Sequence, residues 1–274
     1  MFGNNSIILK YFKSAIHNLF RKIGYDIVYY SKPRRQSTNM NQLSYYETET
    51  GNYFLPTNAV NDIIANAIIN NKIFEKEVVD IAKEYIKPGT CVLDVGSNYG
   101  QMAIQFAKLC GNKGKVYAFD VNDFLYDIII KNIDANNLTQ NIKPIHGAVH
   151  NVLNDELIFP IPDLNQQNHF KSYGSFGIDY NAKVGPKVRT ITIDSLKIDE
   201  PISFMKIDIE GGDLYAMQGA INTIEKNKMP IIFEYDYFIE DVYGMCFQDY
   251  IDFVNSINYR FEKVRGHNYL IVSK

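Results

Sequence analysis

Short apolar runs alternate with amphipathic helical patterns along the chain from about residue 56 to residue 274. The apolar runs have the length of β-strands and cover residues 90–95, 115–120, 142–149, 202–210, 230–236, 259–264 and 267–273. Between them, apolar side chains recur at three- and four-residue spacing, which predicts helices over 58–86 (in two pieces), 101–110, 124–135, 211–220 and 247–257. Strands and helices that alternate at this rhythm predict an α/β fold, built from right-handed βαβ units around a parallel sheet.

The N-terminal part of the chain departs from this pattern. Residues 8–23 form a basic amphipathic pattern that ends at Gly24, and residues 31–52 are polar. We therefore divide the chain into an N-terminal helix with a polar linker, residues 1–55, and a main domain, residues 56–274. Two interpretations of the helix stay open: it packs on the main domain or on a second subunit of a homo-oligomer, or it lies on a membrane surface near anionic lipid.

A second departure covers residues 151–194, which contain several prolines and glycines. Its β-leaning runs at 157–161 and 188–193 predict short strands and loops instead of a helix. An insertion at the ligand edge of a sheet often carries substrate contacts, so we expect this segment to shape the substrate pocket.

Composition and charge narrow the class of protein. The 274 residues carry a formal net charge of −3 and a pI of about 6.0, which disfavours a nucleic-acid partner. The three cysteines are odd in number and lack metal-binding spacing, so we expect free thiols in a reducing compartment. We find no signal-peptide pattern and no apolar run long enough to span a bilayer, so we expect a cytoplasmic protein, with membrane association through residues 8–23 as the alternative.

A glycine-punctuated turn follows the first predicted strand of the sheet. The turn consists of Gly96, Ser97, Asn98, Tyr99 and Gly100. In open α/β sheets, nucleotide-like ligands bind at the carboxyl ends of strands, beside such turns. The dinucleotide fingerprint has a glycine where this chain has Asn98, and that glycine lets the backbone approach a pyrophosphate. The turn therefore favours an adenosine ligand that bears an amino acid, with Asp94 reaching its ammonium group.

A second acid lies at the end of the neighbouring strand. Asp120 follows the turn by 20 residues, where a carboxylate can accept two hydrogen bonds from a ribose diol. A solvated strand-end acid is the alternative. The small pair Gly147 and Ala148, near the end of the third strand, suits a flat adenine ring, and His146 is expected to make a structural hydrogen bond. With Val121, these residues complete the predicted cofactor-binding wall.

Ionisable residues also occur in a strand that should be continuously apolar. Lys206, Asp208 and Glu210 alternate along this strand, so their side chains share one face. Because an unpaired buried charge is very costly, we expect Lys206 to pair with Asp208 or Asp94. Glu234 lies near the end of the next strand, so carboxylates should converge on one edge of the sheet.

Carboxylates that lie close together have raised pKa values or bind a cation. Three interpretations of this edge therefore stay open: a general base, a divalent metal ion at Asp208 and Glu234, or a purely structural network of ion pairs. We assign Lys206, Asp208, Glu210 and Glu234 to the catalytic edge, and Asp208 also to cofactor binding.

Five motifs of the chain resemble those of the FkbM-type family of class I S-adenosylmethionine (SAM)-dependent methyltransferases. They are Val92-Leu93-Asp94-Val95-Gly96-Ser97-Asn98-Tyr99-Gly100, Val116-Tyr117-Ala118-Phe119-Asp120, Thr192-Ile193-Asp194-Ser195-Leu196, Lys206-Ile207-Asp208-Ile209-Glu210-Gly211 and Pro230-Ile231-Ile232-Phe233-Glu234. The resemblance covers about residues 75–272. It implies a Rossmann-like, seven-stranded, mostly parallel sheet with an antiparallel last strand and helices on both faces. It also implies O-methylation, often of sugar hydroxyls.

The resemblance also implies roles for single residues. Those that cradle the methionine end of SAM are Asp94, Gly96, Asn98 and Gly100, next to Ser97 and Tyr99 of the same turn. Asp120 would hold the ribose, and the reacting edge would consist of Asp208, Glu210 and Glu234. Two positions depart from the family pattern: Asp120 replaces a glutamate that is usually followed by proline, and Asp213 replaces a second glutamate.

We therefore expect a SAM-dependent O-methyltransferase that acts on a hydroxyl of a saccharide or glycoconjugate precursor. A carboxylate at the catalytic edge would take the hydroxyl proton. The insertion would shape the acceptor pocket through His169, Tyr173 and Ser175, with His169 as a reserve base. Three alternatives remain at this stage: a nicotinamide-dependent oxidoreductase, an N-methyltransferase acting on nucleic acid, and a SAM-binding module without turnover.

Overall fold

The computed structural model describes residues 42–57, 59, 62–160, 173, 177–178, 183–236, 240 and 243–274. All of them belong to one compact unit, Met40–Lys274. The basic helix predicted over residues 8–23 lies outside the described residues, so both of its interpretations stay predictions. Among the helices that are described, none is both long enough and apolar enough to cross a lipid bilayer.

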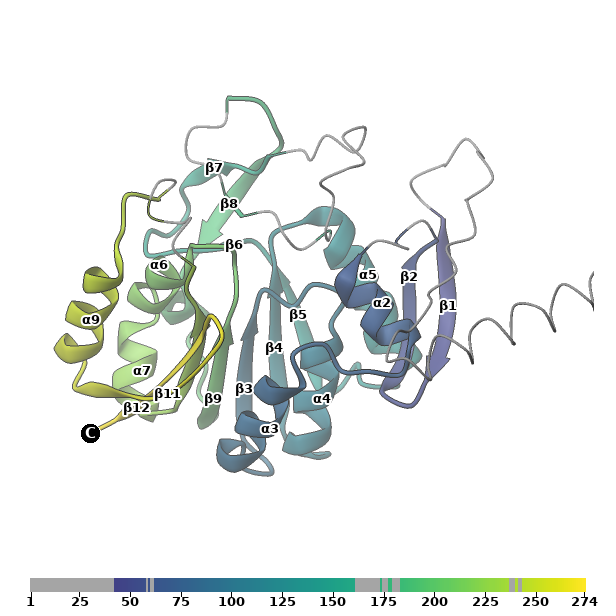
Figure 1. The fold of residues 1–274 in the computed structure, drawn as a ribbon, viewed down its shortest axis with the longest axis horizontal. Coiled ribbons are helices and arrows are strands. Elements are labelled where there is room, and N and C mark those ends of the chain that lie inside the picture. The colour runs from purple at the N-terminus through teal and green to yellow at the C-terminus, as the bar shows by residue number, and fades with distance from the viewer. Residues whose placement is uncertain are drawn as a thin grey trace, which may run out of the picture. The chain divides into compact units, whose positions relative to one another are not determined.

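A seven-stranded sheet forms the centre of this unit (Figure 1), in the order β11-β12-β10-β9-β3-β4-β5. Its strands are β3 (Cys91–Val95), β4 (Lys115–Asp120), β5 (Ile142–His146), β9 (Ile202–Ile207), β10 (Ile231–Glu234), β11 (Tyr259–Arg265) and β12 (Asn268–Ser273). The five strands from β5 to β10 run parallel, and β12 pairs antiparallel with both β10 and β11. The predicted Rossmann-like sheet with an antiparallel last strand is therefore confirmed.

Successive residues of a strand point to opposite sides of the sheet, so side chains leave both of its faces. Helices cover both faces, as is usual for a parallel sheet. They are α2 (Ile63–Ile69), α3 (Lys76–Tyr85), α4 (Gln101–Cys110), α5 (Asp123–Ala135), α6 (Asp213–Gln218), α7 (Ile221–Asn227) and α9 (Phe247–Ser256), with the short 3-10 helix η2 (Ile193–Leu196). Within β3, Val92 packs in the core beneath α3, α4 and α5, whereas Leu93 packs in the core beneath α6, α7 and α9 (Figure 1). The helix predicted over 211–220 is α6, and α7 follows it as a further helix that was not predicted from the sequence. They are separated at Gly219, where a Cβ atom would lie 2.0 Å from the carbonyl oxygen of His150.

A β-hairpin occupies part of the segment that was predicted to be a polar linker, residues 31–52. Its strands are β1 (Leu43–Thr48) and β2 (Gly51–Pro56), which pair antiparallel. The hairpin packs on α5, where the Asn132 side chain hydrogen-bonds both the N–H and the carbonyl of Phe54, at 2.6 and 3.3 Å. Tyr53 and Leu55 are fully buried beneath it. The main domain therefore begins before residue 56, because side-chain amides of α5 pair with the edge of β2 as a neighbouring strand would.

The insertion contains the short strands that the sequence predicts. A small sheet in the order β6-β8-β7 consists of β6 (Ala148–Val149), β7 (Glu156–Ile158) and β8 (Lys187–Ile191). The single strand predicted over 142–149 is two strands, because Gly147 has a φ of 153° and turns the chain from the large sheet into the small one. Residues 161–172, which include His169, lie outside the described residues, as does Ser175.

Candidate active site

Residues with positive φ shape the turn after β3. The φ angle is 85° at Gly96, 51° at Asn98 and 81° at Gly100. A Cβ atom at Gly96 would lie 1.8 Å from the carbonyl oxygen of Asp208, so only glycine fits there. Asn98 adopts the left-handed conformation with a local hydrogen bond, in which its Oδ1 accepts from the Tyr99 N–H at 2.7 Å. The turn is therefore packed directly against the segment that follows β9.

Asp120, at the end of β4, holds the other side of the turn. Its Oδ2 accepts from the Asn98 N–H and its Oδ1 from the Asn122 N–H, both at 2.9 Å. Burial raises the pKa of Asp120 to about 6, although these two hydrogen bonds lower it. Each carboxylate oxygen keeps capacity for a further donor, which is what a ribose diol would supply. The Nε2 atom of His146 lies 3.1 Å from the Val121 carbonyl oxygen and 3.1 Å from Asp123 Oδ1, so a structural hydrogen bond of His146 is present.

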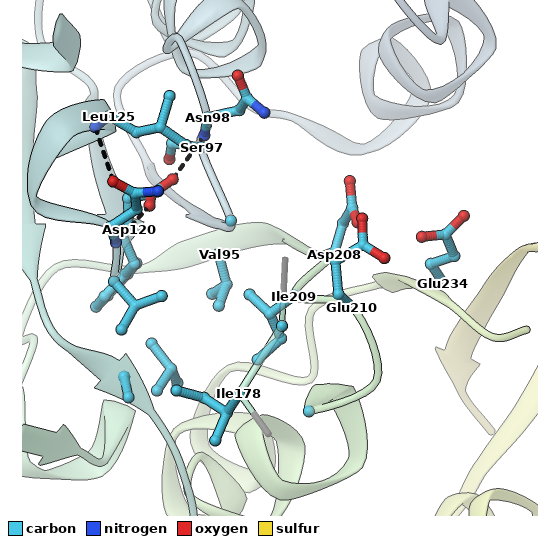
Figure 2. Close-up of a pocket in the computed structure, with 18 of the residues that line it drawn as sticks. Val95, Ser97, Asn98, Asp120, Leu125, Ile178, Asp208, Ile209, Glu210 and Glu234 are labelled. Atoms are coloured by element: carbon cyan, nitrogen blue, oxygen red, sulfur yellow. Dashed lines mark hydrogen bonds between the residues drawn. The ribbon is translucent and has the colours of Figure 1, made fainter. Parts of the chain in front are cut away.

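One cavity joins the turn, Asp120 and the acidic edge, which is the part of the wall formed by Glu75, Asp208, Glu210 and Glu234. Its wall includes the predicted site residues Gly96, Ser97, Asn98, Tyr99, Asp120, Val121, Gly147, Ala148, Lys206, Asp208, Glu210 and Glu234. Figure 2 shows Asp208, Glu210 and Glu234 on one side of this cavity and Asp120 on the other. Of the predicted residues, Asp94 and Gly100 are absent from the wall.

Several wall residues were missed in the sequence. Asn122 and Leu125 come from the start of α5, and Leu157 and Phe159 come from the insertion. Asn122 was within reach of sequence reasoning, because it caps α5 directly after the strand that ends in Asp120. Glu75, which precedes α3, gives no sequence signal, because only the packing of α3 beside β9 brings it to the cavity.

Asp94 lies behind the cavity instead of in its wall. It is fully buried, and neither carboxylate oxygen accepts a hydrogen bond from the residues that the structure describes. Asp94 pairs with Lys206 in the register of β3 and β9, so both side chains leave the sheet on one face, with Lys206 Nζ 4.0 Å from Asp94 Oδ1. The charged neighbour of Asp94 in the structure is Lys206, and the predicted contact of Asp94 with a ligand ammonium group stays a prediction.

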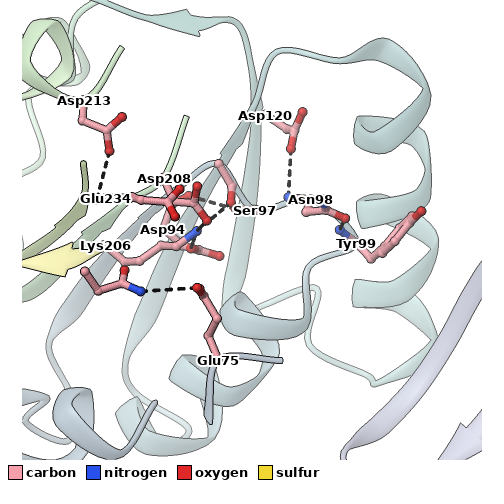
Figure 3. A network of polar contacts seen from close by, with 12 residues as sticks. Glu75, Asp94, Ser97, Asn98, Tyr99, Asp120, Lys206, Asp208, Asp213 and Glu234 are labelled. Atoms are coloured by element: carbon pink, nitrogen blue, oxygen red, sulfur yellow. Dashed lines mark hydrogen bonds and ion pairs between the residues drawn. The ribbon is translucent and has the colours of Figure 1, made fainter. Parts of the chain in front are cut away.

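Lys206 links the turn to the acidic edge (Figure 3). Its Nζ donates to the Gly96 carbonyl oxygen and to Asp208 Oδ2, both at 3.0 Å. Burial lowers the pKa of Lys206, but Asp208 and Asp94 raise it by more, so the lysine stays charged. The expected pairing of Lys206 is confirmed for both Asp208 and Asp94. Lys206 therefore acts as a clamp, because it connects the turn after β3 with the segment after β9.

We expect Lys206→Met to lower the free energy of unfolding by about 3 kcal/mol at pH 7, because it leaves the fully buried Asp94 and the partly buried Asp208 without their cation. Urea denaturation followed by circular dichroism measures the change. Lys115→Met is the matched control, since the Lys115–Glu200 ion pair is exposed and its loss should cost far less. Equal losses in the two variants would contradict the role of Lys206 as a clamp.

The profile of the FkbM methyltransferase domain matches residues 94–261, which is more than half of the chain. The chain belongs to the FkbM methyltransferase family. It is therefore a member of a SAM-dependent methyltransferase family, and the nicotinamide-dependent oxidoreductase is set aside.

Individual relatives match smaller parts of this FkbM-family chain. The ribosomal protein L11 methyltransferase of Caldicellulosiruptor saccharolyticus is 32% identical over 108 residues, which are 36% of this chain and 34% of that protein. The ubiquinone/menaquinone biosynthesis C-methyltransferase UbiE of a Marinomonas species is 24% identical over 84 residues, 31% of this chain and 32% of that protein. The chain thus spans about a third of the length of these curated relatives. A crystal structure of the FkbM methyltransferase of Methylobacillus flagellatus covers 71% of this chain and 50% of its own, at 14% identity and a TM-score of 0.46.

The acidic edge of this FkbM-family chain holds carboxyl groups with raised pKa values. Burial, and then the neighbouring Asp208, raise the pKa of Glu210 to about 8. Burial, with Asp208 and Glu210, raises the pKa of Glu234 to about 9. Burial and Asp208 also raise the pKa of Glu75. Asp208 differs from these groups because it is the ion-pair partner of Lys206.

Glu210 owes its position to a turn and not to strand alternation. The strand predicted over 202–210 ends at Ile207, and the chain then turns through positive φ angles of 55° at Glu210 and 101° at Gly211. A positive φ is uncommon outside glycine, and such conformations gather at functional sites. Gly177 of the insertion packs on this turn, where a Cβ atom would lie 2.6 Å from the Glu210 carbonyl oxygen. The backbone thus directs the Glu210 side chain into the cavity between the turn and the insertion.

A metal site gains no support from this geometry. Within the part of the chain that the structure describes, no group of three His, Cys, Asp or Glu side chains is arranged to hold a metal ion. The metal site predicted at Asp208 and Glu234 therefore stays a prediction.

Proposed function

We propose that this chain methylates a hydroxyl group of a saccharide or glycoconjugate precursor, with SAM as the methyl donor. The observation that carries the proposal is a single cavity with Asp120 on one side and the acidic edge on the other. Membership of the FkbM family supports methyl transfer, and the cavity supports the assignment of residues.

The residues around Asp120 fit the adenosine part of SAM. Asp120 is buried, accepts two backbone hydrogen bonds and keeps capacity for a diol. Leu125 and Phe159 give apolar walls beside Gly147 and Ala148, where a flat ring needs small residues. The turn from Gly96 would hold the methionine part through backbone and Asn98 groups.

The acidic edge fits the charge of SAM and the chemistry of a hydroxyl acceptor. When bound, SAM supplies an electrophilic methyl group on a positively charged sulfur. The carboxyl groups of Glu75, Asp208, Glu210 and Glu234 line the cavity, where a positively charged sulfur would favour their ionised forms. A cation bound there lowers the pKa values of the carboxyl groups that surround it.

Glu210 is the best candidate for the general base. Asp208 is already the ion-pair partner of Lys206, whose Nζ donates to its Oδ2 at 3.0 Å. Glu234, whose pKa is raised to about 9, is protonated at neutral pH. Glu210 has a pKa raised to about 8, close to the value that suits a base near neutral pH. It would accept the hydroxyl proton while the enzyme aligns oxygen, methyl carbon and sulfur.

The test is an acceptor screen with methyl-labelled SAM and a panel of nucleotide sugars, lipid-linked sugars and free oligosaccharides, with and without chelator. We expect label in an O-methyl ether of a sugar, with a rate that chelator leaves unchanged when Glu210 is the base. Label on nitrogen or carbon, or label transferred to protein or nucleic acid in preference to every saccharide, would overturn the proposal. The same screen with added vesicles tests the predicted membrane contact, and sedimentation tests the predicted homo-oligomer.

A further inference from the structure

Asp62 is a buried carboxylate outside the region that the family profile matches. It is fully buried at the start of α2, and its Oδ1 accepts from the N–H groups of Ile64 and Ala65 at 3.0 and 2.8 Å. This oxygen therefore caps the helix.

The second oxygen of Asp62 joins two segments that are far apart in the sequence. Its Oδ2 accepts from the hydroxyl of Tyr99 and from the backbone N–H of Tyr173, both at 2.9 Å. Tyr99 belongs to the turn after β3, and Tyr173 belongs to the insertion. Both tyrosines line the cavity, so one carboxylate connects the turn with the insertion, which is expected to shape the acceptor pocket.

Each of the two tyrosines also contacts other residues around the cavity. The Tyr99 carbonyl oxygen accepts from Asn132 Nδ2 at 2.8 Å, and its N–H donates to Asn98, the turn residue whose own N–H donates to Asp120. The ring of Tyr173 lies 5.3 Å from that of Phe124, between centroids. A ligand that fixes Asn98 and Asp120 thus restrains Tyr99, and through Asp62 it restrains Tyr173.

We propose that Asp62 is a positioning residue that couples cofactor binding at the turn to the placement of Tyr173 in the acceptor wall. The inference rests on the proposed function, because it takes the ligand of the turn to be SAM or its product S-adenosylhomocysteine (SAH). Four donors occupy the two oxygens of Asp62, so a shift of either tyrosine would lengthen or break one of these hydrogen bonds. Coupling of this kind is reciprocal: what SAH does to the Tyr173 contact, the contact does to the affinity for SAH.

Asp62→Asn separates the coupling from the helix cap. The amide oxygen can still accept from both N–H groups of α2, and the Tyr99 hydroxyl can reverse its hydrogen bond and accept from Nδ2. The Tyr173 N–H can only donate, so it faces a donor and loses its partner. Tyr99→Phe is the complementary variant, since it removes the hydroxyl and leaves the Tyr173 contact. Asp127→Asn, on the exposed face of α5, makes the same chemical change as a control.

Hydrogen–deuterium exchange at the Tyr173 amide, with and without SAH, measures both parts of the proposal. In Asp62→Asn without ligand, we expect roughly tenfold faster exchange than in the wild type, as befits a lost hydrogen bond to a charged group. SAH should slow this exchange in the wild type and in Asp127→Asn, but not in Asp62→Asn or Tyr99→Phe. Calorimetry should show weaker SAH binding in Asp62→Asn by the same factor that SAH protects the wild-type amide.

The outcomes distinguish the inference from the proposed function. Equal SAH-dependent protection in the wild type and Asp62→Asn, with SAH bound to both, would overturn the coupling alone. Absence of SAH binding to the wild type would overturn the proposed function and the coupling together. If Asp62→Asn does not fold, Tyr99→Phe decides: the coupling is wrong if SAH protects the Tyr173 amide there as in the wild type.

Discussion

Replacing Asp120 by alanine is expected to weaken the binding of SAH by at least about 100-fold. In the structure, Asp120 is the buried acceptor beside the turn, and each oxygen already accepts one backbone N–H. A ribose diol would lose two hydrogen bonds to a charged group, together worth about 3 kcal/mol or more, or about 100-fold in affinity. The N–H groups of Asn98 and Asn122 would also lose their partner, so the turn itself would lose order.

Titration calorimetry with SAH measures this loss, and thermal unfolding shows whether the variant is folded. Asp123→Ala is the matched control, because Asp123 lies three residues away with its side chain 77% exposed. It should bind SAH within about twofold of the wild type, since surface substitutions rarely exceed a few tenths of a kcal/mol. A folded Asp120→Ala that binds within tenfold of the wild type would remove Asp120 from the ribose site.

Glu210→Gln is expected to lower kcat by roughly 100-fold or more while leaving SAH affinity within a few-fold of the wild type. General base catalysis typically contributes about 10²- to 10⁴-fold to a rate, and glutamine has the shape of glutamate without its basicity. Removal of one carboxylate charge also lowers the pKa of Glu234, since Glu210 is among the groups that raise it. The turn should keep its conformation, because the positive φ at residue 210 is a property of the backbone and the substitution changes only the side chain.

The pH dependence of kcat/KM for SAM, which reports groups of the free enzyme, gives a second measure of the same assignment. Because the pKa of Glu210 is raised to about 8 in the free chain, the unprotonated base becomes more abundant as the pH rises from 6 to 8. The wild-type kcat/KM should therefore rise with pH across this range, and that of Glu210→Gln should not. Glu225→Gln, on the exposed side of α7, is the control and should keep both the rate and the profile. A full rate in Glu210→Gln, with a large loss in Asp208→Asn, would transfer the role to Asp208.

The central sheet could be predicted because its signals are local. Each parallel strand is a short apolar run bounded by turn residues, and each helix repeats its apolar positions at helical spacing. The hairpin at Leu43–Thr48 and Gly51–Pro56 was missed for the opposite reason. Its strands follow a polar segment, and they are held by Asn132 of α5 and by Asn136, which caps that helix, about 80 residues away. Pattern analysis of a short window cannot see partners at that separation.

The candidate site could be predicted to the extent that it depends on strand ends. Parallel strands bring their carboxyl ends to one edge, so Asp120, Asp208 and Glu234 were expected together and do line one cavity. Asp94 lies behind the cavity because its position depends on strand register: it lies opposite Lys206, with Nζ of the lysine 4.0 Å from its Oδ1. Glu75, which lines the cavity, and Asp62, which holds two tyrosines of its wall, went unnoticed because both precede the recognisable motifs.

The hairpin limits which segment of this domain can be exchanged between proteins. The family profile begins at residue 94, yet Tyr53, Leu55 and Ile68 fill the same apolar core as Phe106 and Ile129. A chimera that grafts residues 94–261 onto a foreign N-terminal segment would leave α4 and α5 with an uncovered apolar face. In this chain, the segment that the family profile matches is therefore smaller than the segment that must be transferred to keep the core intact, which begins no later than Leu43.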